Sequence, residues 1–165
     1  MARIALPAGD DSESLKLIGL QPAFGNAMAV LSDAIYNQSS LDLRVREAVR
    51  MRIAQLNQCQ LCLDFRFPEL VDAGIDEAFY AAVADWRSEP SFSAAEKLAI
   101  DYAERFANDH LSIDDAFMQQ LQQHFAAEEL FELTYSIAGL LANGRTLQVL
   151  QIDQSCQLSK DIDKC

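Results

Sequence analysis

Apolar residues recur at helical spacing along most of the chain. After Pro22 they are spaced by four, three and four positions, which predicts a helix over residues 22–37 (Phe24, Met28, Leu31 and Ile35). Similar spacing, together with N-cap and stop signals, predicts further helices over 41–57, 59–73 with an interruption near Pro68, 76–84, 93–106, 112–125 and 127–152. No segment shows the period-2 alternation of a strand, so the chain is predicted to be an all-α bundle of about six to seven helices.

The polar and apolar stretches divide the chain into three parts. Residues 1–20 form an N-terminal arm, polar at first and then briefly apolar. Residues 21–152 form one helical domain, which is long enough to bury a core without disulfides. Residues 153–165 form a polar C-terminal tail with two of the four cysteines, Cys156 and Cys165.

The helix over 41–57 carries apolar residues on two faces. One face is broad, and a second, narrower stripe contains Glu47 (with Leu43, Met51 and Ala54). A glutamate in an apolar stripe is desolvated, which raises its pKa and suits it to proton transfer. The alternative is a surface glutamate paired with Arg46 or Arg50.

The charge and the N-terminal composition limit the partners and the compartment. The formal net charge is −12, which disfavours binding to nucleic acid or to an anionic membrane surface. The N-terminal residues contain no signal-like apolar stretch, and no run of residues is long enough to span a membrane. We therefore expect a cytoplasmic protein whose thiols are kept reduced.

Cys59 and Cys62 form a CxxC pair, which in such a compartment indicates redox or metal chemistry more often than a structural link. If residues 59–66 are helical, both cysteines share a face with Arg66, and the pair can close a disulfide. Zinc needs four ligands, usually two such pairs or one pair with two histidines. The chain has no second CxxC, and His110 and His124 lie far downstream, so no metal or cofactor is expected. A pair of inert core cysteines is the remaining alternative. From the residues alone, Cys59 would be the nucleophile, because the first cysteine of a CxxC is usually the more exposed.

The spacing of the glutamate and the cysteine pair resembles a known family: Glu47 is followed, after eleven residues, by Cys59-Gln-Leu-Cys62. The motif E-x11-C-x-x-C-x3-H is that of the alkylhydroperoxidase AhpD-like branch of the carboxymuconolactone decarboxylase superfamily. The similarity extends through Phe92–Glu104 and, less specifically, to Asn143–Arg145. The resemblance implies an all-helical fold that assembles into trimers or hexamers. It also implies a thiol peroxidase or disulfide reductase, in which Cys62 attacks a hydroperoxide, Cys59 resolves the product and Glu47 is the relay carboxylate. A lipoyl or thioredoxin-like dithiol protein would then reduce the disulfide.

The chain departs from this motif at Arg66, where the family has histidine. Arginine remains protonated and cannot accept a proton from a thiol. We therefore expect Arg66 to hold the thiolate by its charge. Two other functions stay open: a non-enzymatic oligomer that responds to redox state, and a lactone enzyme of the decarboxylase type with idle cysteines.

Overall fold

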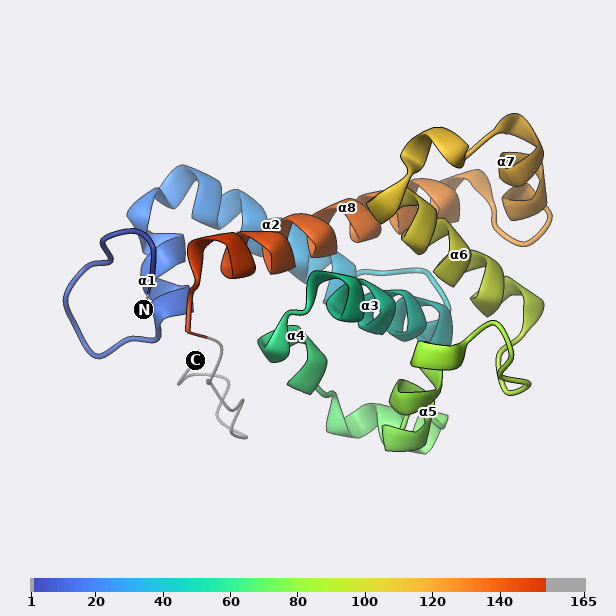
Figure 1. The fold of residues 1–165 in the computed structure, drawn as a ribbon, viewed down its shortest axis with the longest axis horizontal. Helices are drawn as coiled ribbons and strands as arrows, with labels where there is room; N and C mark the ends of the chain where they lie inside the picture. The colour runs from blue at the N-terminus through green and yellow to red at the C-terminus, as the bar shows by residue number, and fades with distance from the viewer. Residues whose placement is uncertain (1, 154–165) are drawn as a thin grey trace.

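The computed structural model describes residues 2–153, and within them it contains only helices as regular structure. The α-helices are α1 (Glu13–Leu20), α2 (Pro22–Asn37), α3 (Leu43–Asn57), α4 (Gln60–Asp64), α5 (Glu77–Ala82), α6 (Ala94–Asn108), α7 (Asp115–Gln122) and α8 (Ala127–Leu150) (Figure 1). Short 3₁₀ helices cover Pro68–Ala73, Val83–Asp85 and His110–Ser112. The all-α prediction is confirmed. The eight α-helices of the described part exceed the predicted six to seven because α1 lies within residues 1–20, which the pattern assigned to an arm.

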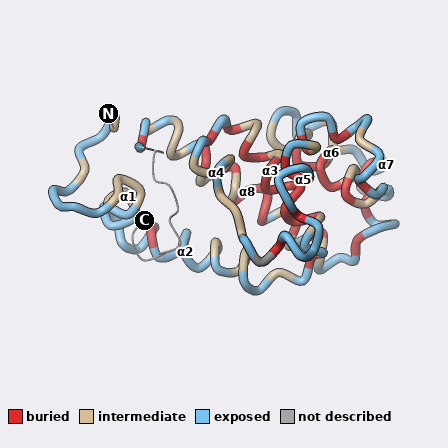
Figure 2. The backbone as a smooth tube through the Cα atoms, turned by 90° about the horizontal axis from the view of Figure 1, so that it is seen from below, coloured by how far each residue is buried: buried red, intermediate tan, exposed pale blue. Residues whose placement is uncertain are grey.

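Helix α3 lies at the centre of the fold, between two groups of buried side chains. Val45, Val49 and Ile53 pack with residues of α6, α7 and α8. Ala48 and Met51 pack on the other side, with residues of α5, its adjoining 3₁₀ helices and Ile100. The predicted packing of this helix on two sides is confirmed. Figure 2 shows that the buried positions concentrate around α3, α6 and α8, whereas α1 and α2 are largely exposed.

Several predicted helix ends match the structure. The sequence Ser93-Ala-Ala-Glu96 predicts a capping box, and Ser93 and Glu96 form it at the start of α6. Gly74 adopts the left-handed conformation, with a φ of 73°, and ends the 3₁₀ helix that follows Pro68. The polar residues 37–40 predict an N-cap for the helix over 41–57, and this prediction is wrong. Asp42 is the N-cap of α3, and its side chain accepts hydrogen bonds from the backbone N–H groups of Arg44 and Val45.

In the sequence, Gly139 and Gly144 predict a weakened or bent helix over 127–152, but α8 continues through both glycines. Gly144 instead allows close contact with α3. A Cβ atom at this position would lie 2.4 Å from Nδ2 of Asn57, which donates hydrogen bonds to the carbonyls of Leu140 and Leu141. The glycine therefore lets the end of α3 lie directly against α8.

We expect Gly144→Ala to lower the free energy of unfolding by about 1–3 kcal/mol, because the added methyl group must displace a hydrogen-bonded side chain. Gly19→Ala is the matched control. No atom lies within 4 Å of the position that a Cβ on Gly19 would take, so alanine in this exposed helix should be neutral or stabilising by up to about 1 kcal/mol. Urea unfolding of both variants tests this, and equal stabilities for the two would contradict the close contact.

The N-terminal segment lies against the end of α8 (Figure 1). The backbone N–H of Arg3 donates to the carbonyl of Leu150 at 2.8 Å, and its Nη1 donates to the carbonyl of Val149 at 3.1 Å. At the other end of this segment α1 folds back on α2, where a Cβ atom on Gly25 would lie 2.3 Å from the carbonyl oxygen of Ile18. Residues 2–20 are thus packed onto the rest of the chain rather than extended from it.

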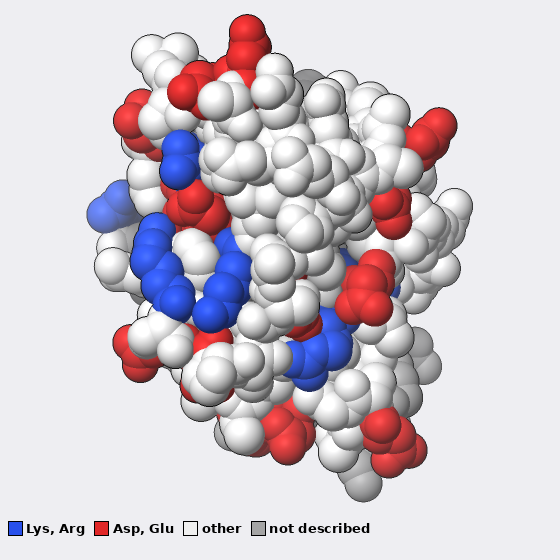
Figure 3. Space-filling view, turned by 90° about the vertical axis from the view of Figure 1, so that its right-hand side faces the viewer, with Lys and Arg blue, Asp and Glu red and all other residues white. Residues whose placement is uncertain are grey.

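On the face shown in Figure 3, basic and acidic side chains lie next to one another. Glu104 of α6 forms ion pairs with Arg52 of α3 at 2.5 Å and with Arg87 at 2.5 Å, and it accepts a hydrogen bond from the indole of Trp86 at 3.0 Å. Trp86 and Arg87 follow the 3₁₀ helix 83–85. These contacts hold the C-terminal half of α3 against α6.

In the part of the chain that the structure describes, no helix is both long and apolar enough to cross a bilayer.

Candidate active site

Cys59 and Cys62 are joined by a disulfide, with their Cα atoms 5.2 Å apart. Cys59 has an exposed fraction of 0% and is the N-cap residue of α4. Cys62 is partly exposed and lines a cavity. The expectation from the residues alone that Cys59 is the more exposed thiol is therefore wrong. Gln58 ends α3 with a φ of 52°, and Cys59 follows directly as the buried N-cap of α4, where its sulfur accepts from the backbone N–H of Cys62.

The cavity beside Cys62 has a volume of about 300 Å³. Helix α3 contributes Arg50, Ile53, Ala54 and Asn57 to its wall. Helix α8 contributes Leu140, Asn143 and Leu147, and α1 contributes Ser14, Leu15 and Ile18. The remaining wall consists of Tyr36, Leu61 and Phe65. Most of these side chains are apolar, so the disulfide faces an apolar pocket with a few polar groups near the sulfur, the usual character of a small-molecule site.

Glu47 is completely buried and pairs with two arginines of its own helix. Its Oε2 accepts a hydrogen bond from Nε of Arg50 at 2.8 Å, and its Oε1 lies 3.7 Å from Nε of Arg46. Oε1 and the Arg46 Nε have no hydrogen-bond partner among the described residues. Each interpretation of Glu47 is partly right. The side chain is desolvated, as the first one expects, and it is paired with Arg46 and Arg50, as the second one expects, but it does not lie at the surface.

Arg50 connects this carboxylate to the CxxC segment. Its side chain is 2% exposed, and its guanidinium donates to the carbonyl of Cys62 at 2.9 Å and to that of Phe65 at 3.3 Å. Burial is the largest single influence on the pKa of Arg50 and lowers it, but the Glu47 carboxylate, Tyr36 and Tyr80 together raise it, so the net shift is upward. Arg50 is therefore a permanent cation at the wall of the cavity that contains Cys62.

Two tyrosines complete the surroundings of Glu47 and Arg50. The hydroxyl of Tyr80 donates to Oε2 of Glu47 at 3.2 Å. Burial raises the pKa of Tyr80, and the Glu47 carboxylate raises it further. Burial also raises the pKa of Tyr36, which lines the cavity. Both hydroxyls therefore keep their protons at neutral pH, and the Tyr80 hydroxyl donates its proton to Glu47.

The predicted role of Arg66 depends on a continuous helix over 59–66, and this premise is wrong. Helix α4 ends at Asp64, and Phe65 has extended backbone angles, as expected shortly before Pro68. The Arg66 guanidinium forms an ion pair with Glu77 at 2.6 Å and lies over the ring of Tyr80, with its Cζ 4.2 Å from the ring centroid. Arg50, not Arg66, is the cation that lines the cavity with Cys62.

We expect Arg66→Ala to leave the pH dependence of Cys62 alkylation unchanged. Its effect should appear at Glu77, whose pKa is lowered mainly by the hydrogen bond from Arg66. This pairing stabilises the fold above the unfolded-state pKa of Glu77, and the stabilisation is lost as the pH falls through the lower folded-state pKa. It is worth at most about 1 kcal/mol, since solvent screens the exposed carboxylate. Glu77→Gln is the matched variant, and a shifted alkylation profile in Arg66→Ala alone would contradict this assignment.

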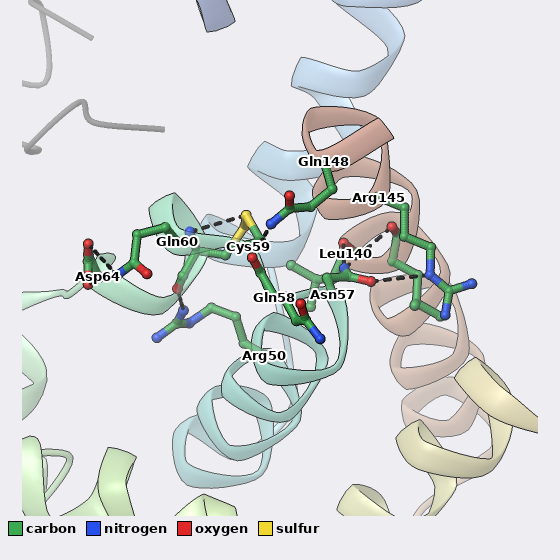
Figure 4. The surroundings of a disulfide bond; sticks show 11 residues. Arg50, Asn57, Gln58, Cys59, Gln60, Asp64, Leu140, Arg145 and Gln148 are labelled. Atoms are coloured by element: carbon green, nitrogen blue, oxygen red, sulfur yellow. Dashed lines mark hydrogen bonds between the residues drawn. A yellow bond between two sulfur atoms is a disulfide. The ribbon is translucent and has the colours of Figure 1, made fainter. Parts of the chain in front are cut away.

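Helix α8 holds the segment that leads into the CxxC pair (Figure 4). The Asn57 side chain donates to the Leu140 carbonyl at 3.2 Å and accepts from Nε of Arg145 at 3.2 Å. The Gln148 side chain donates to the carbonyl of Gln58. The resemblance over Asn143–Arg145 thus corresponds to a structural contact that fixes the backbone immediately before Cys59.

The sequence interpretation named Arg50 only as a surface partner of Glu47 and gave no role to Tyr36, Tyr80 or Asn57. A signal for Arg50 was present, because it lies three residues after Glu47 and so on the same side of a helix that is packed on two sides. The role of Asn57 could be inferred from Gly144 only if the contact between α3 and α8 were already known.

Cys156 and Cys165 lie outside the described residues. Within residues 2–153 no group of three or more His, Cys, Asp or Glu side chains could hold a metal ion.

Comparison with known proteins shows what the chain is similar to in sequence and fold. A model of the Carboxymuconolactone decarboxylase family matches residues 22–105. The uncharacterized protein YnjA of Escherichia coli K12 is 40% identical over 97 residues, which cover 59% of this chain and 53% of YnjA, so the match spans about half of that protein.

Two solved structures show the same fold. ATU0492 of Agrobacterium tumefaciens, a protein of unknown function suggested to be the antioxidant defence protein AhpD, has a TM-score of 0.73 at 19% identity, over 95% of this chain and 100% of that one. The debrominase Bmp8, in complex with 2,3,4-tribromopyrrole, has a TM-score of 0.70 at 16% identity, over 87% of this chain and 76% of that one. Such low identities establish the fold and leave the reaction to be argued from the site.

Proposed function

The chain belongs to the carboxymuconolactone decarboxylase family and has the AhpD-like fold, and from this premise we propose that it is a thiol-dependent peroxidase. The observation that carries the proposal is the placement of Cys62. This cysteine lines an apolar cavity next to the buried cation of Arg50, and it is bonded to a second, fully buried cysteine. A reactive thiol with a resolving thiol behind it is the arrangement that reversible oxidation requires.

In the proposed reaction the Cys62 thiolate attacks the terminal oxygen of a hydroperoxide. The S–O bond forms, the O–O bond breaks and the alkoxide takes a proton, which gives a sulfenic acid and an alcohol. Cys59 then attacks the Cys62 sulfur, forming the disulfide and releasing hydroxide, which takes a proton to become water. A dithiol reductant finally exchanges with the disulfide, so that two thiols are oxidised for each peroxide reduced.

The contacts of the site support these steps. The Arg50 charge at the cavity wall favours the thiolate form of Cys62. The backbone N–H of Cys62 donates to the Cys59 sulfur at 3.3 Å, a contact that favours the thiolate in the resolving step. Glu47 lies behind Arg50 rather than in the cavity wall, so we assign it first to holding Arg50 in place. Its oxygen Oε1, buried without a hydrogen-bond partner among the described residues, is our candidate to accept a proton in the relay that the family motif implies.

We further propose that the reductant is a lipoyl or thioredoxin-like dithiol protein and that the reaction takes place in the cytoplasm, where such reductants keep thiols reduced. The test is consumption of hydroperoxide by the full chain in the presence of dihydrolipoamide or reduced thioredoxin. Turnover of peroxide with either dithiol supports a peroxidase. Disulfide formation without peroxide consumption would instead favour a redox-responsive oligomer, and conversion of a carboxymuconolactone would favour the lactone enzyme.

We also propose that the chain assembles into a homo-oligomer through α2 and the adjacent part of α8. Only Gly25 and Ile35 are buried in α2, although most of the helix is apolar. Phe24 and Val30 are 72% and 69% exposed, and Phe131 of α8 is 66% exposed. Large exposed apolar patches usually mark interfaces, and α2 presents several such side chains to the surface. Light scattering should give a trimer or hexamer, and Phe24→Asp with Phe131→Asp should shift it toward the monomer; a wild-type monomer at micromolar concentration would contradict the proposal.

A further inference from the structure

Helix α1 forms one wall of the cavity that contains Cys62. Three of its residues, Ser14, Leu15 and Ile18, line the cavity together with side chains of α3 and α8. This helix lies outside residues 22–105, the part of the chain that the family model matches. Its contribution to the site is therefore a feature of this chain beyond the matched region.

Helix α1 contributes no fully buried side chain to the core. It has eight residues, too few for a stable isolated helix, so its position depends on packing. Three contacts hold it or the segment next to it. The Ile18 carbonyl packs closely on Gly25, Arg3 bonds to the end of α8, and the side chain of Glu13 accepts from the backbone N–H of Asp153 at 2.7 Å. These contacts place the Leu15 and Ile18 side chains against the cavity rather than in the protein interior.

The polar groups around Cys62 and the apolar side chains of α1 belong to different parts of the cavity wall. Arg50, Asn57 and Cys62 come from α3 and α4, whereas Leu15 and Ile18 come from α1. A hydroperoxide whose peroxide group meets Cys62 near Arg50 therefore directs its organic part toward the apolar walls. The volume of about 300 Å³ exceeds the ~150 Å³ of an apolar cavity known to bind benzene, so an aromatic ring with a short substituent fits.

We infer that Leu15 and Ile18 of α1 are specificity-determining residues, which select substrates with a compact apolar body for reaction at Cys62. The inference rests on the proposed peroxidase function for the identity of the substrate. Hydrogen peroxide has no apolar part to contact α1, so its reaction is independent of this helix. The selection itself acts on any reagent that must enter the cavity to reach Cys62.

Two pairs of reagents test the inference on the reduced full-length protein. The first pair is cumene hydroperoxide and hydrogen peroxide, with the rate of Cys59–Cys62 disulfide formation as the readout. The second pair is N-benzyl iodoacetamide and iodoacetamide, in which the Cys62 thiolate displaces iodide, with the labelled Cys62 peptide measured by mass spectrometry. In the variant Leu15→Ser/Ile18→Ser, the rate with the aromatic member of each pair should fall roughly tenfold relative to the small member.

Leu20→Ser is the matched control, because Leu20 is as exposed as Leu15 on the same helix (44% and 43%) but does not line the cavity. Gly25→Ala is a second variant that leaves every cavity side chain unchanged. Its Cβ would meet the backbone of α1, so the helix must shift and the same selectivity should be lost.

The inference is overturned if the rate with the aromatic reagent, relative to that with the small reagent, is the same as in the wild type in both Leu15→Ser/Ile18→Ser and Gly25→Ala. If neither peroxide oxidises any of the proteins, the proposed peroxidase function fails, and the two alkylating reagents still decide whether α1 controls entry. A lower rate of Cys62 labelling by N-benzyl iodoacetamide relative to iodoacetamide in the variants then supports selection by α1. An unchanged relative rate contradicts it.

Discussion

Replacing Cys62 by serine is expected to abolish peroxide consumption down to the uncatalysed rate, whereas Cys59→Ser should retain a single round of reaction. Cys62 faces the cavity and carries the sulfur that a peroxide can reach, while Cys59 is fully buried. Without Cys62 no accessible thiolate of the pair remains. Without Cys59 the sulfenic acid forms on Cys62 but cannot close the disulfide, so one hydroperoxide is reduced per chain and the reaction stops.

The two variants should be compared by stopped-flow peroxide consumption and by trapping of the sulfenic acid with dimedone. Dimedone should label Cys62 in Cys59→Ser and should not label Cys59 in Cys62→Ser. The reverse pattern, with a single turnover in Cys62→Ser, would mean that Cys59 becomes exposed in the reduced protein and attacks first. The double serine variant provides the baseline for any contribution of Cys156 and Cys165.

The second large effect is expected from Arg50→Met, which should lower the free energy of unfolding by about 3–5 kcal/mol. Methionine fills much of the same space but leaves the carboxylate of Glu47 buried, with Arg46 3.7 Å away as its remaining ion-pair partner. The carbonyl groups of Cys62 and Phe65 also lose a donor. Urea unfolding of the wild type and the variant measures the difference.

A double-mutant cycle separates the ion pair from general loss of packing. Glu47→Gln and Arg50→Met should each be strongly destabilising, and the double variant should be less destabilised than the sum of the two, because neither buried charge then lacks its partner. Arg52→Met is a comparison on the same helix, since Arg52 pairs with Glu104 at the partly exposed side of α3. Additive effects of Glu47→Gln and Arg50→Met would show that the pair does not act as a unit.

The helices were predictable because their local signals are strong. The spacing of apolar residues placed α2, α3, α6 and α8, and the capping box at Ser93 and the stop at Gly74 set two of the helix boundaries. The two-sided packing of α3 followed from its second apolar stripe. Helix α1 was missed because its eight residues follow a polar stretch and bury none of their side chains in the core.

The site was predictable only as far as the motif reaches. Glu47, Cys59 and Cys62 were named from their spacing, and the structure places Glu47 and Cys62 on either side of Arg50. Arg66 was placed on the cysteine face by assuming that α4 continues through Phe65. Pro68 limits that helix, and Arg66 instead reaches Glu77, a residue eleven positions later that no local pattern connects to it.

The contribution of α1 and α8 to the cavity could not be predicted, because it depends on contacts between distant parts of the chain. Leu15 and Leu147 line the same cavity although they lie near opposite ends of the chain. The close approaches at Gly25 and Gly144 decide these positions, and a glycine in the sequence does not reveal which atom will lie against it. Hydrophobic spacing predicts which face of a helix is buried but not which helix covers it.

The central claim, that the pair reduces hydroperoxides through Cys62, is tested most directly by a single-turnover experiment on the reduced wild-type protein. One equivalent of cumene hydroperoxide is added without any reductant, the alcohol formed is quantified, and the cysteine linkage is determined by peptide mass spectrometry. We predict one alcohol per chain, formed together with one Cys59–Cys62 disulfide. Peroxide that remains unconsumed, in protein whose Cys59–Cys62 disulfide still forms readily with diamide, would contradict the account.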